Sequence, residues 1–213
     1  MNLRILGGLC AVVVPALAGA QAAPDTGKAC FAARPVPECK TFWITEVGWY
    51  HRAFGSGSIQ NVPAGVYARP ELNGHLSWEL GLMSNRSRGI AVGGTLLVGG
   101  GGGSWRFGLN GRYRRWLGER SSIDVSAGPL GVVTHAPYSQ PHRAAYGMNA
   151  AVALGWRDWA AVTVSADAVR GGGHNATAVY TGVRLGSYPA IVATAAVAAY
   201  IGLLLALLSG EGT

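Results

Sequence analysis

Charged side chains recur on one face of several segments in which apolar and polar residues alternate. Seven of these residues share the polar face: Glu79, Arg106, Arg112, Arg114, Asp124, Asp167 and Arg184. An unpaired charge on an enclosed face is costly, so the carboxylate and guanidinium groups are expected to pair. The pattern predicts a structural salt-bridge network, and an ion or substrate path is the alternative.

Residue types that carry catalysis or bind metals lack the spacing that those functions need. No H-x-x-x-H, zinc-type Cys/His or G-x-S-x-G pattern occurs, and no Lys-Ser or Lys-Thr follows the glycine runs. The histidines are scattered over predicted strands and loops: His51, His75, His135, His142 and His174. Of these, His135 and His142 bracket one loop and form the pair to test for metal binding. The sequence predicts no catalytic, cofactor or metal site and no enzymatic activity.

The alternating segments are the predicted strands that position the charged face. In residues 72–84, for example, Leu76 and Trp78 lie on the face opposite Glu79. Lengths of about 10 to 14 residues exceed those of ordinary strands and suit tilted strands that cross a bilayer. Eight such segments occur, at residues 40–54, 72–84, 88–98, 104–116, 121–134, 144–156, 159–170 and 176–187.

The connections between these segments alternate in character along the chain. Short charged turns, with the sequences NRSR, LGER and RD, alternate with longer or glycine-rich connections such as GGGGG, HAPYSQPHR and GGGHN. In an up-and-down meander, alternate connections lie at the same end of the sheet. The short turns are therefore expected at one rim, together with both termini, and the longer loops at the other.

The N-terminal region has the features of an exported chain. Residues 1–22 combine Arg4, an apolar run and small residues near Ala20 and Ala22, which predicts a cleaved signal peptide. Residues 23–39 then contain Cys30 and Cys39, which most simply form one disulfide in an exported protein. Closing so short a loop stabilises by only about 2 to 3 kcal/mol, so the bridge is expected to pin this segment and not to hold the fold together.

The composition is that of a protein partly surrounded by lipid. Charged residues make up 13% of the chain, and glycine supplies 33 of its 213 residues. A typical soluble domain is about one quarter charged. The 17 basic residues outnumber the 10 acidic ones but form no cluster, which argues against nucleic acid as a partner.

In this pattern, residues 40–187 resemble the small eight-stranded outer-membrane β-barrels. The resemblance implies an all-β, antiparallel up-and-down barrel, with the seven charged residues facing its lumen. It also implies that aromatic residues at strand ends form girdles at the membrane interfaces. The aromatic residues in question are Trp43, Trp49, Tyr50, Trp105, Trp116, Trp156 and Trp159.

A second membrane element is predicted in the C-terminal residues 188–213. Residues 190–208 carry no charge and would span about 28 Å as a helix, close to the hydrocarbon thickness of a bilayer. Small residues at four-residue spacing would let another helix approach closely, which favours an integral-membrane partner. That helix-packing face contains Ala190, Thr194, Ala198, Gly202 and Ala206.

Two arrangements accommodate both membrane elements, and the lipid bilayer is a partner in each. In the first, the barrel spans the outer membrane as a non-enzymatic structural protein or narrow pore, and the helix packs at its periplasmic rim. In the second, a periplasmic β-domain turns its apolar face inward and the helix anchors it in the inner membrane. That domain would act as an accessory or stabilising subunit of a membrane protein complex. The strand lengths, the loop pattern and the aromatic residues favour the first arrangement.

Overall fold

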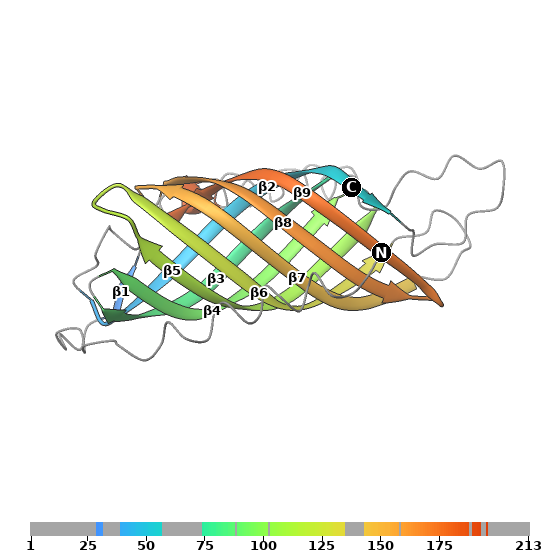
Figure 1. The fold of residues 1–213 in the computed structure, drawn as a ribbon, viewed down its shortest axis with the longest axis horizontal. Coiled ribbons are helices and arrows are strands. Elements are labelled where there is room, and N and C mark those ends of the chain that lie inside the picture. The colour runs from blue at the N-terminus through green and yellow to red at the C-terminus, as the bar shows by residue number, and fades with distance from the viewer. Residues whose placement is uncertain are drawn as a thin grey trace, which may run out of the picture.

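Eight long strands form a closed antiparallel barrel in the computed structural model (Figure 1). Each strand pairs with its neighbour in sequence, and β9 also pairs with β2, which closes the sheet. The prediction of an eight-stranded up-and-down barrel is confirmed. The strands are β2 (Thr41–Ser56), β3 (Gly74–Ser87), β4 (Ile90–Gly101), β5 (Ser104–Trp116), β6 (Ser121–Thr134), β7 (Arg143–Trp156), β8 (Ala160–Gly171) and β9 (His174–Gly186).

The structure describes most of the predicted barrel and little of the chain on either side of it. The described residues are 29–31, 39–56, 74–87, 89–101, 103–134, 143–157, 159–187, 189–192 and 195. The predicted signal peptide at residues 1–22 lies outside them. The same holds for Thr194, Ala198, Gly202 and Ala206 of the predicted helix-packing face and for the pair His135 and His142.

Alternate residues along each strand face the barrel interior and the barrel exterior, as strand geometry requires. The exterior is apolar, with Trp49 72%, Leu109 62% and Val162 64% exposed. Apart from Thr45, the buried polar and charged residues of the strands occupy the opposite face. The inward apolar face that the periplasmic alternative required is therefore wrong for this barrel.

Aromatic residues flank the apolar exterior, although two of those predicted for the girdles lie inside. One end of the barrel holds the β3–β4, β5–β6 and β7–β8 turns, and we call this end the turn rim. Near it, three tryptophans are exposed: Trp43, Trp156 and Trp159. Trp49 and Trp105 are also exposed. By contrast, Tyr50 and Trp116 are buried inside the barrel, because each occupies an inward-facing position of its strand.

The opposite end, the loop rim, differs from the sequence prediction at its glycine-rich connections. GGGGG and GGGHN were expected as loops, but half of these glycines belong to the strands: Gly99, Gly100 and Gly101 to β4, and Gly171 to β8. β4 and β5 are joined by residues 102–103, and β8 and β9 by Gly172 and Gly173. Both of the latter residues have positive φ values, 58° and 82°, which glycine adopts without strain in a tight hairpin turn. The two long connections of the loop rim are residues 57–73 and 135–142.

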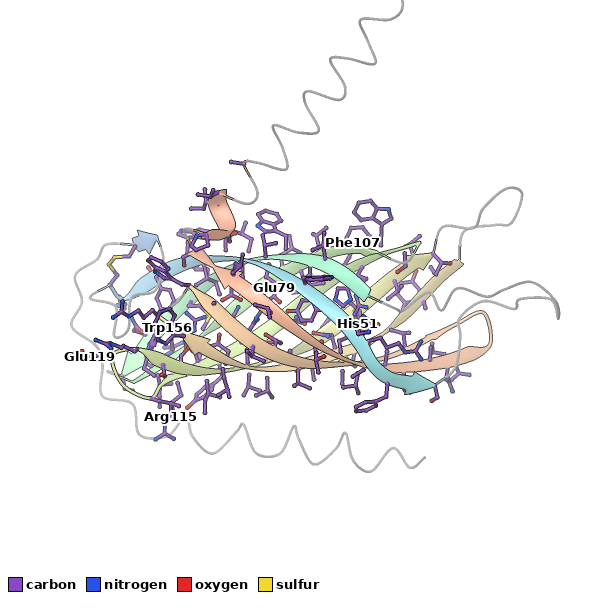
Figure 2. All side chains as sticks on the ribbon, turned by 90° about the horizontal axis from the view of Figure 1, so that it is seen from above. His51, Glu79, Phe107, Arg115, Glu119 and Trp156 are labelled. Carbon is purple, nitrogen blue, oxygen red and sulfur yellow. A yellow bond between two sulfur atoms is a disulfide. The ribbon has the colours of Figure 1, made fainter. Side chains whose placement is uncertain are left out.

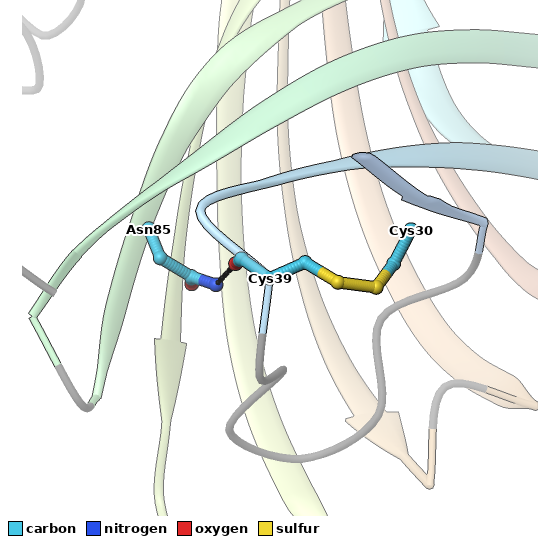
Figure 3. The surroundings of a disulfide bond; sticks show 3 residues. All are labelled: Cys30, Cys39 and Asn85. Atoms are coloured by element: carbon cyan, nitrogen blue, oxygen red, sulfur yellow. Dashed lines mark hydrogen bonds between the residues drawn. A yellow bond between two sulfur atoms is a disulfide. The ribbon is translucent and has the colours of Figure 1, made fainter. Parts of the chain in front are cut away.

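A short strand that the sequence did not predict lies beside the barrel at the turn rim. β1 (Ala29–Phe31) pairs in parallel with residues 41–43 of β2, a part of β2 that β9 does not reach. The predicted disulfide between Cys30 and Cys39 is present and ties β1 to the start of β2, with the two Cα atoms 5.9 Å apart (Figure 3). Asn85 of β3 donates a hydrogen bond to the Cys39 carbonyl oxygen at 2.6 Å.

Replacing both Cys30 and Cys39 by Ser is expected to release β1 while leaving the barrel folded. The pairing of β1 is only three residues long, so it depends on the covalent link. Amide hydrogen exchange of residues 41–43 should become faster, and the loss in free energy of unfolding should not exceed about 3 kcal/mol. Loss of the folded barrel in the double variant would contradict this local role.

After β9 the chain begins a helical segment. Most of the helix predicted from the sequence, residues 190–208, lies outside the described residues. Residues 189–192 are helical, and Ala190 is fully buried. Among the described residues, no helix is long and apolar enough to cross a membrane.

Candidate functional site in the barrel interior

The interior side chains of β5 show how the barrel is filled from one rim to the other. Alternate residues of this strand face inward, and they change in chemistry along it. Arg106 lies toward the loop rim, Asn110 lies near the middle, and Arg112 and Arg114 follow. Trp116 then occupies the turn rim. All five side chains are buried.

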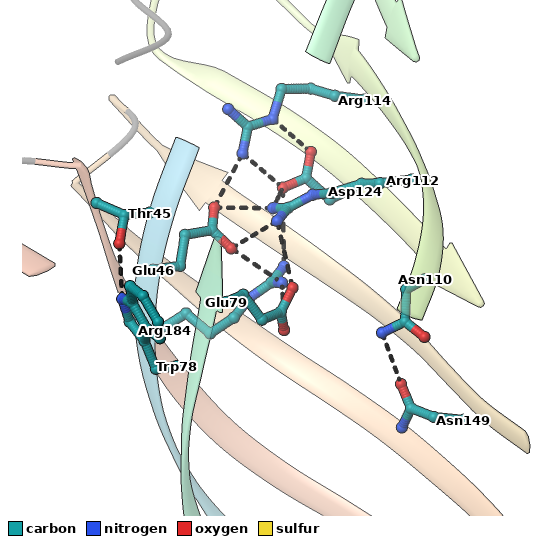
Figure 4. A network of polar contacts seen from close by, with 10 residues as sticks. All are labelled: Thr45, Glu46, Trp78, Glu79, Asn110, Arg112, Arg114, Asp124, Asn149 and Arg184. Carbon is teal, nitrogen blue, oxygen red and sulfur yellow. Dashed lines mark hydrogen bonds and ion pairs between the residues drawn. The ribbon is translucent and has the colours of Figure 1, made fainter. Parts of the chain in front are cut away.

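Six charged residues from five strands meet in the half of the barrel nearer the turn rim, and we call them the central cluster (Figure 4). Arg112 contacts carboxylates on three strands: Glu46 at 2.7 Å, Glu79 at 3.5 Å, and Asp124. Arg114 binds Asp124 through Nε at 2.6 Å. The members are Glu46, Glu79, Arg112, Arg114, Asp124 and Arg184.

Glu46 of β2 is the member that sequence reasoning missed. Its carboxylate accepts hydrogen bonds from Arg112 at 2.7 and 2.8 Å and from Arg114 at 3.1 Å. It also lies 3.1 Å from a guanidinium nitrogen of Arg184. With Glu46 included, three carboxylates face three guanidinium groups, so the central cluster is electrically balanced.

The other two predicted charged residues form a separate pair toward the loop rim. Arg106 of β5 binds Asp167 of β8 and donates a hydrogen bond to the Tyr180 hydroxyl at 3.0 Å. The Arg106 guanidinium also lies over the Tyr180 ring. His75 completes this group, because its ring stacks on Tyr50 and meets Tyr180 edge-on.

Two asparagines lie on the interior face between the central cluster and the Arg106–Asp167 pair. Asn149 of β7 donates a hydrogen bond to Asp167 at 2.7 Å. Asn110 of β5 donates in turn to Asn149 at 3.3 Å. The structure thus places all seven residues predicted from the sequence inside the barrel, in two groups, and adds Glu46 to one of them.

Apolar side chains occupy the interior on both sides of the central cluster. The turn-side cluster contains Phe42, Ile44, Met83, Ala91 and Trp116, and Cys30 of the disulfide packs against it. The loop-side cluster contains Tyr50, Leu97, Leu130, Val132, Ala145, Val169, Ala176, Ala178 and Tyr180. The buried charges are consequently screened from water at both ends.

The interior charges of the central cluster are paired with one another. Each carboxylate of the central cluster is engaged by at least one guanidinium group. Among the described residues, no group of three or more His, Cys, Asp or Glu side chains could hold a metal ion.

Taken together, the closed sheet, the even number of strands, the apolar exterior and the polar interior define a β-barrel of the outer-membrane type. No protein-family model matches the chain, and comparison with curated proteins finds no match.

Solved structures similar to this chain include Ail, the attachment invasion locus protein of Yersinia pestis. The match has 8% identity and a TM-score of 0.41, and it covers 68% of this chain and 97% of that one. A second is the N-terminal β-barrel domain of Pseudomonas aeruginosa OprF. It has 12% identity and a TM-score of 0.38, with 67% and 96% of the two chains covered.

Proposed function

We propose that this chain is a non-enzymatic structural barrel of the outer membrane, closed to ions by its own interior side chains. The observation that carries the proposal is the balanced central cluster, which lies between two apolar clusters. An ion that crosses the barrel would have to displace paired guanidinium and carboxylate groups and pass apolar side chains at both ends. We therefore favour a structural plug over the narrow pore.

Glu79→Ala tests the plug, because this substitution weakens the central cluster while leaving both apolar clusters in place. Glu79 lies 3.5 Å from Arg112 and 3.6 Å from Arg184, so its loss leaves positive charge unbalanced. We expect the variant to unfold at a lower temperature, as measured by heat-modifiable gel migration. In planar bilayers we expect neither the wild type nor the variant to conduct.

Two outcomes would contradict this proposal. Discrete conductance steps from the wild-type barrel would favour the narrow pore. Unchanged heat resistance in Glu79→Ala would show that the charges do not stabilise the fold. Glu119→Ala is the matched control, because Glu119 is exposed in the β5–β6 turn.

The proposal for the C-terminal residues 188–213 is a helix that packs against the barrel at the turn rim or binds another integral-membrane protein. Its support is the helical start at residues 189–192 and the burial of Ala190, the first residue of the predicted packing face. Crosslinking in mild detergent tests this part, and a stoichiometric integral-membrane partner is the outcome that favours a protein interface.

A further inference from the structure

Three exposed arginines lie at the turn rim, in or next to the β5–β6 and β7–β8 turns, and we call them the arginine patch: Arg115, Arg120 and Arg157. The backbone N–H of Arg157 donates to the Arg120 carbonyl oxygen at 2.8 Å, which holds the β5–β6 and β7–β8 turns side by side. Arg157 also lies over the Trp156 ring, 5.4 Å from its centre. Figure 2 shows Arg115 and Trp156 at the same end of the barrel.

Arg115 faces outward within an otherwise apolar row of cross-strand neighbours. It pairs with Ile90 on β4 and with Ile123 on β6. Beyond Ile123 the row continues through Leu154 and Val162, both strongly exposed. A lipid-facing arginine is costly at the bilayer midplane, and this cost falls toward zero near the interface. Its guanidinium group is therefore expected to reach from the apolar row to the headgroup region.

The arginine patch has no anionic partner among the described residues. None of its three guanidinium groups forms an ion pair there, although all are exposed. Among the turn residues and outward-facing flanks of the three short turns, arginines outnumber carboxylates by three in the sequence. They are Arg86, Arg88, Arg115, Arg120 and Arg157, against Glu119 and Asp158. This rim therefore carries net positive charge.

We propose that the arginine patch binds the headgroups of anionic phospholipids in the leaflet on the side of the short turns. A guanidinium group matches a phosphate in a two-point hydrogen-bonded geometry, and Trp156 is an aromatic residue of the kind enriched at membrane interfaces. The proposal rests on the membrane-spanning role of the barrel and adds a preferred lipid to it.

The test uses the full chain folded into vesicles that contain equal amounts of phosphatidylcholine and phosphatidylglycerol. Native mass spectrometry of the released barrel then measures how much of each lipid is retained. Because a basic residue near an anionic surface contributes roughly 1 kcal/mol, Arg115→Gln should lower phosphatidylglycerol retention about fivefold. The double variant Arg115→Gln and Arg157→Gln should lower it about thirtyfold.

Glu119→Gln is the matched control, since Glu119 is an exposed charged residue in the β5–β6 turn of the same rim but is not basic. It should retain phosphatidylglycerol as the wild type does. An equal loss in this control, or no wild-type preference for phosphatidylglycerol, would overturn the lipid proposal.

A second measurement separates lipid binding from stability: each variant is folded into phosphatidylcholine vesicles, and its folding is followed by gel migration. A wild-type chain that inserts into neither vesicle would contradict the membrane role as well.

Discussion

Replacing Glu46 by Gln is expected to lower the free energy of unfolding of the barrel by about 3 to 5 kcal/mol. The Glu46 carboxylate touches Arg112, Arg114 and Arg184, whereas Gln keeps the size of the side chain and removes the charge. Three buried guanidinium groups would then face only two carboxylates. Unfolding in urea, followed by tryptophan fluorescence and gel migration, measures the loss.

Two comparisons show whether charge balance causes that loss. Glu119→Gln removes a carboxylate from the exposed β5–β6 turn and should change the free energy of unfolding by no more than about 0.5 kcal/mol. Adding Arg184→Gln to Glu46→Gln restores the balance and should recover part of the stability. The double variant could instead lose more free energy of unfolding than the two single variants lose in sum. That result would mean that the geometry of Glu46 matters more than its charge.

The need for Glu46 could be inferred from the sequence by adding the charges on the predicted inward face. Arg106, Arg112, Arg114 and Arg184 exceed Glu79, Asp124 and Asp167 by one. Glu46 is the remaining carboxylate within the predicted strands. Its face was hard to assign because strand β2 does not alternate cleanly. Phe42 and Ile44 are apolar but face inward, and Thr45 is buried on the outer face beneath Trp78.

The fold itself was predictable because the two faces of each strand differ strongly. One face is apolar and contacts lipid, and the other is largely polar and faces the interior, so apolar and polar residues alternate clearly along the sequence. The segment from Leu76 to Leu82 alternates without exception between exposed or half-buried apolar residues and buried inward ones. The same rule failed where the interior is apolar. Tyr50 and Trp116 were placed in the girdles because they are aromatic and near strand ends, but they belong to the two apolar clusters of the interior.

Features that depend on contacts between distant segments left no periodic signal. β1 is three residues long, and its pairing exists because β9 ends opposite Glu46 and leaves the start of β2 uncovered. The glycine-rich connections were misjudged for a related reason. Glycine is common both in loops and in strands that must approach closely, and only the pairing partners distinguish the two.

Gly182→Ala is expected to impair closure of the barrel, because Gly182 lies on β9 where this strand meets β2. An added Cβ atom would clash with the Trp49 carbonyl oxygen and would lie 2.8 Å from Cδ1 of the Tyr50 ring. The carbonyl belongs to the backbone of the closing pair, so it cannot yield without moving the strand. The loss in free energy of unfolding should reach about 3 kcal/mol, the upper end of the usual cost of overpacking.

Gly94→Ala is the control that separates this clash from a general effect of losing glycine in a strand. A Cβ atom at Gly94 would meet its nearest neighbour, the Asn110 carbonyl oxygen, at 3.7 Å, an ordinary contact distance. Refolding into vesicles should therefore yield as much heat-modifiable barrel for Gly94→Ala as for the wild type, and clearly less for Gly182→Ala. Combining Gly182→Ala with Tyr50→Ala removes the ring contact but leaves the carbonyl contact, so yield should not return to the wild-type level. Full recovery in that double variant would mean that the Tyr50 ring, and not the closing backbone, limits the space at Gly182.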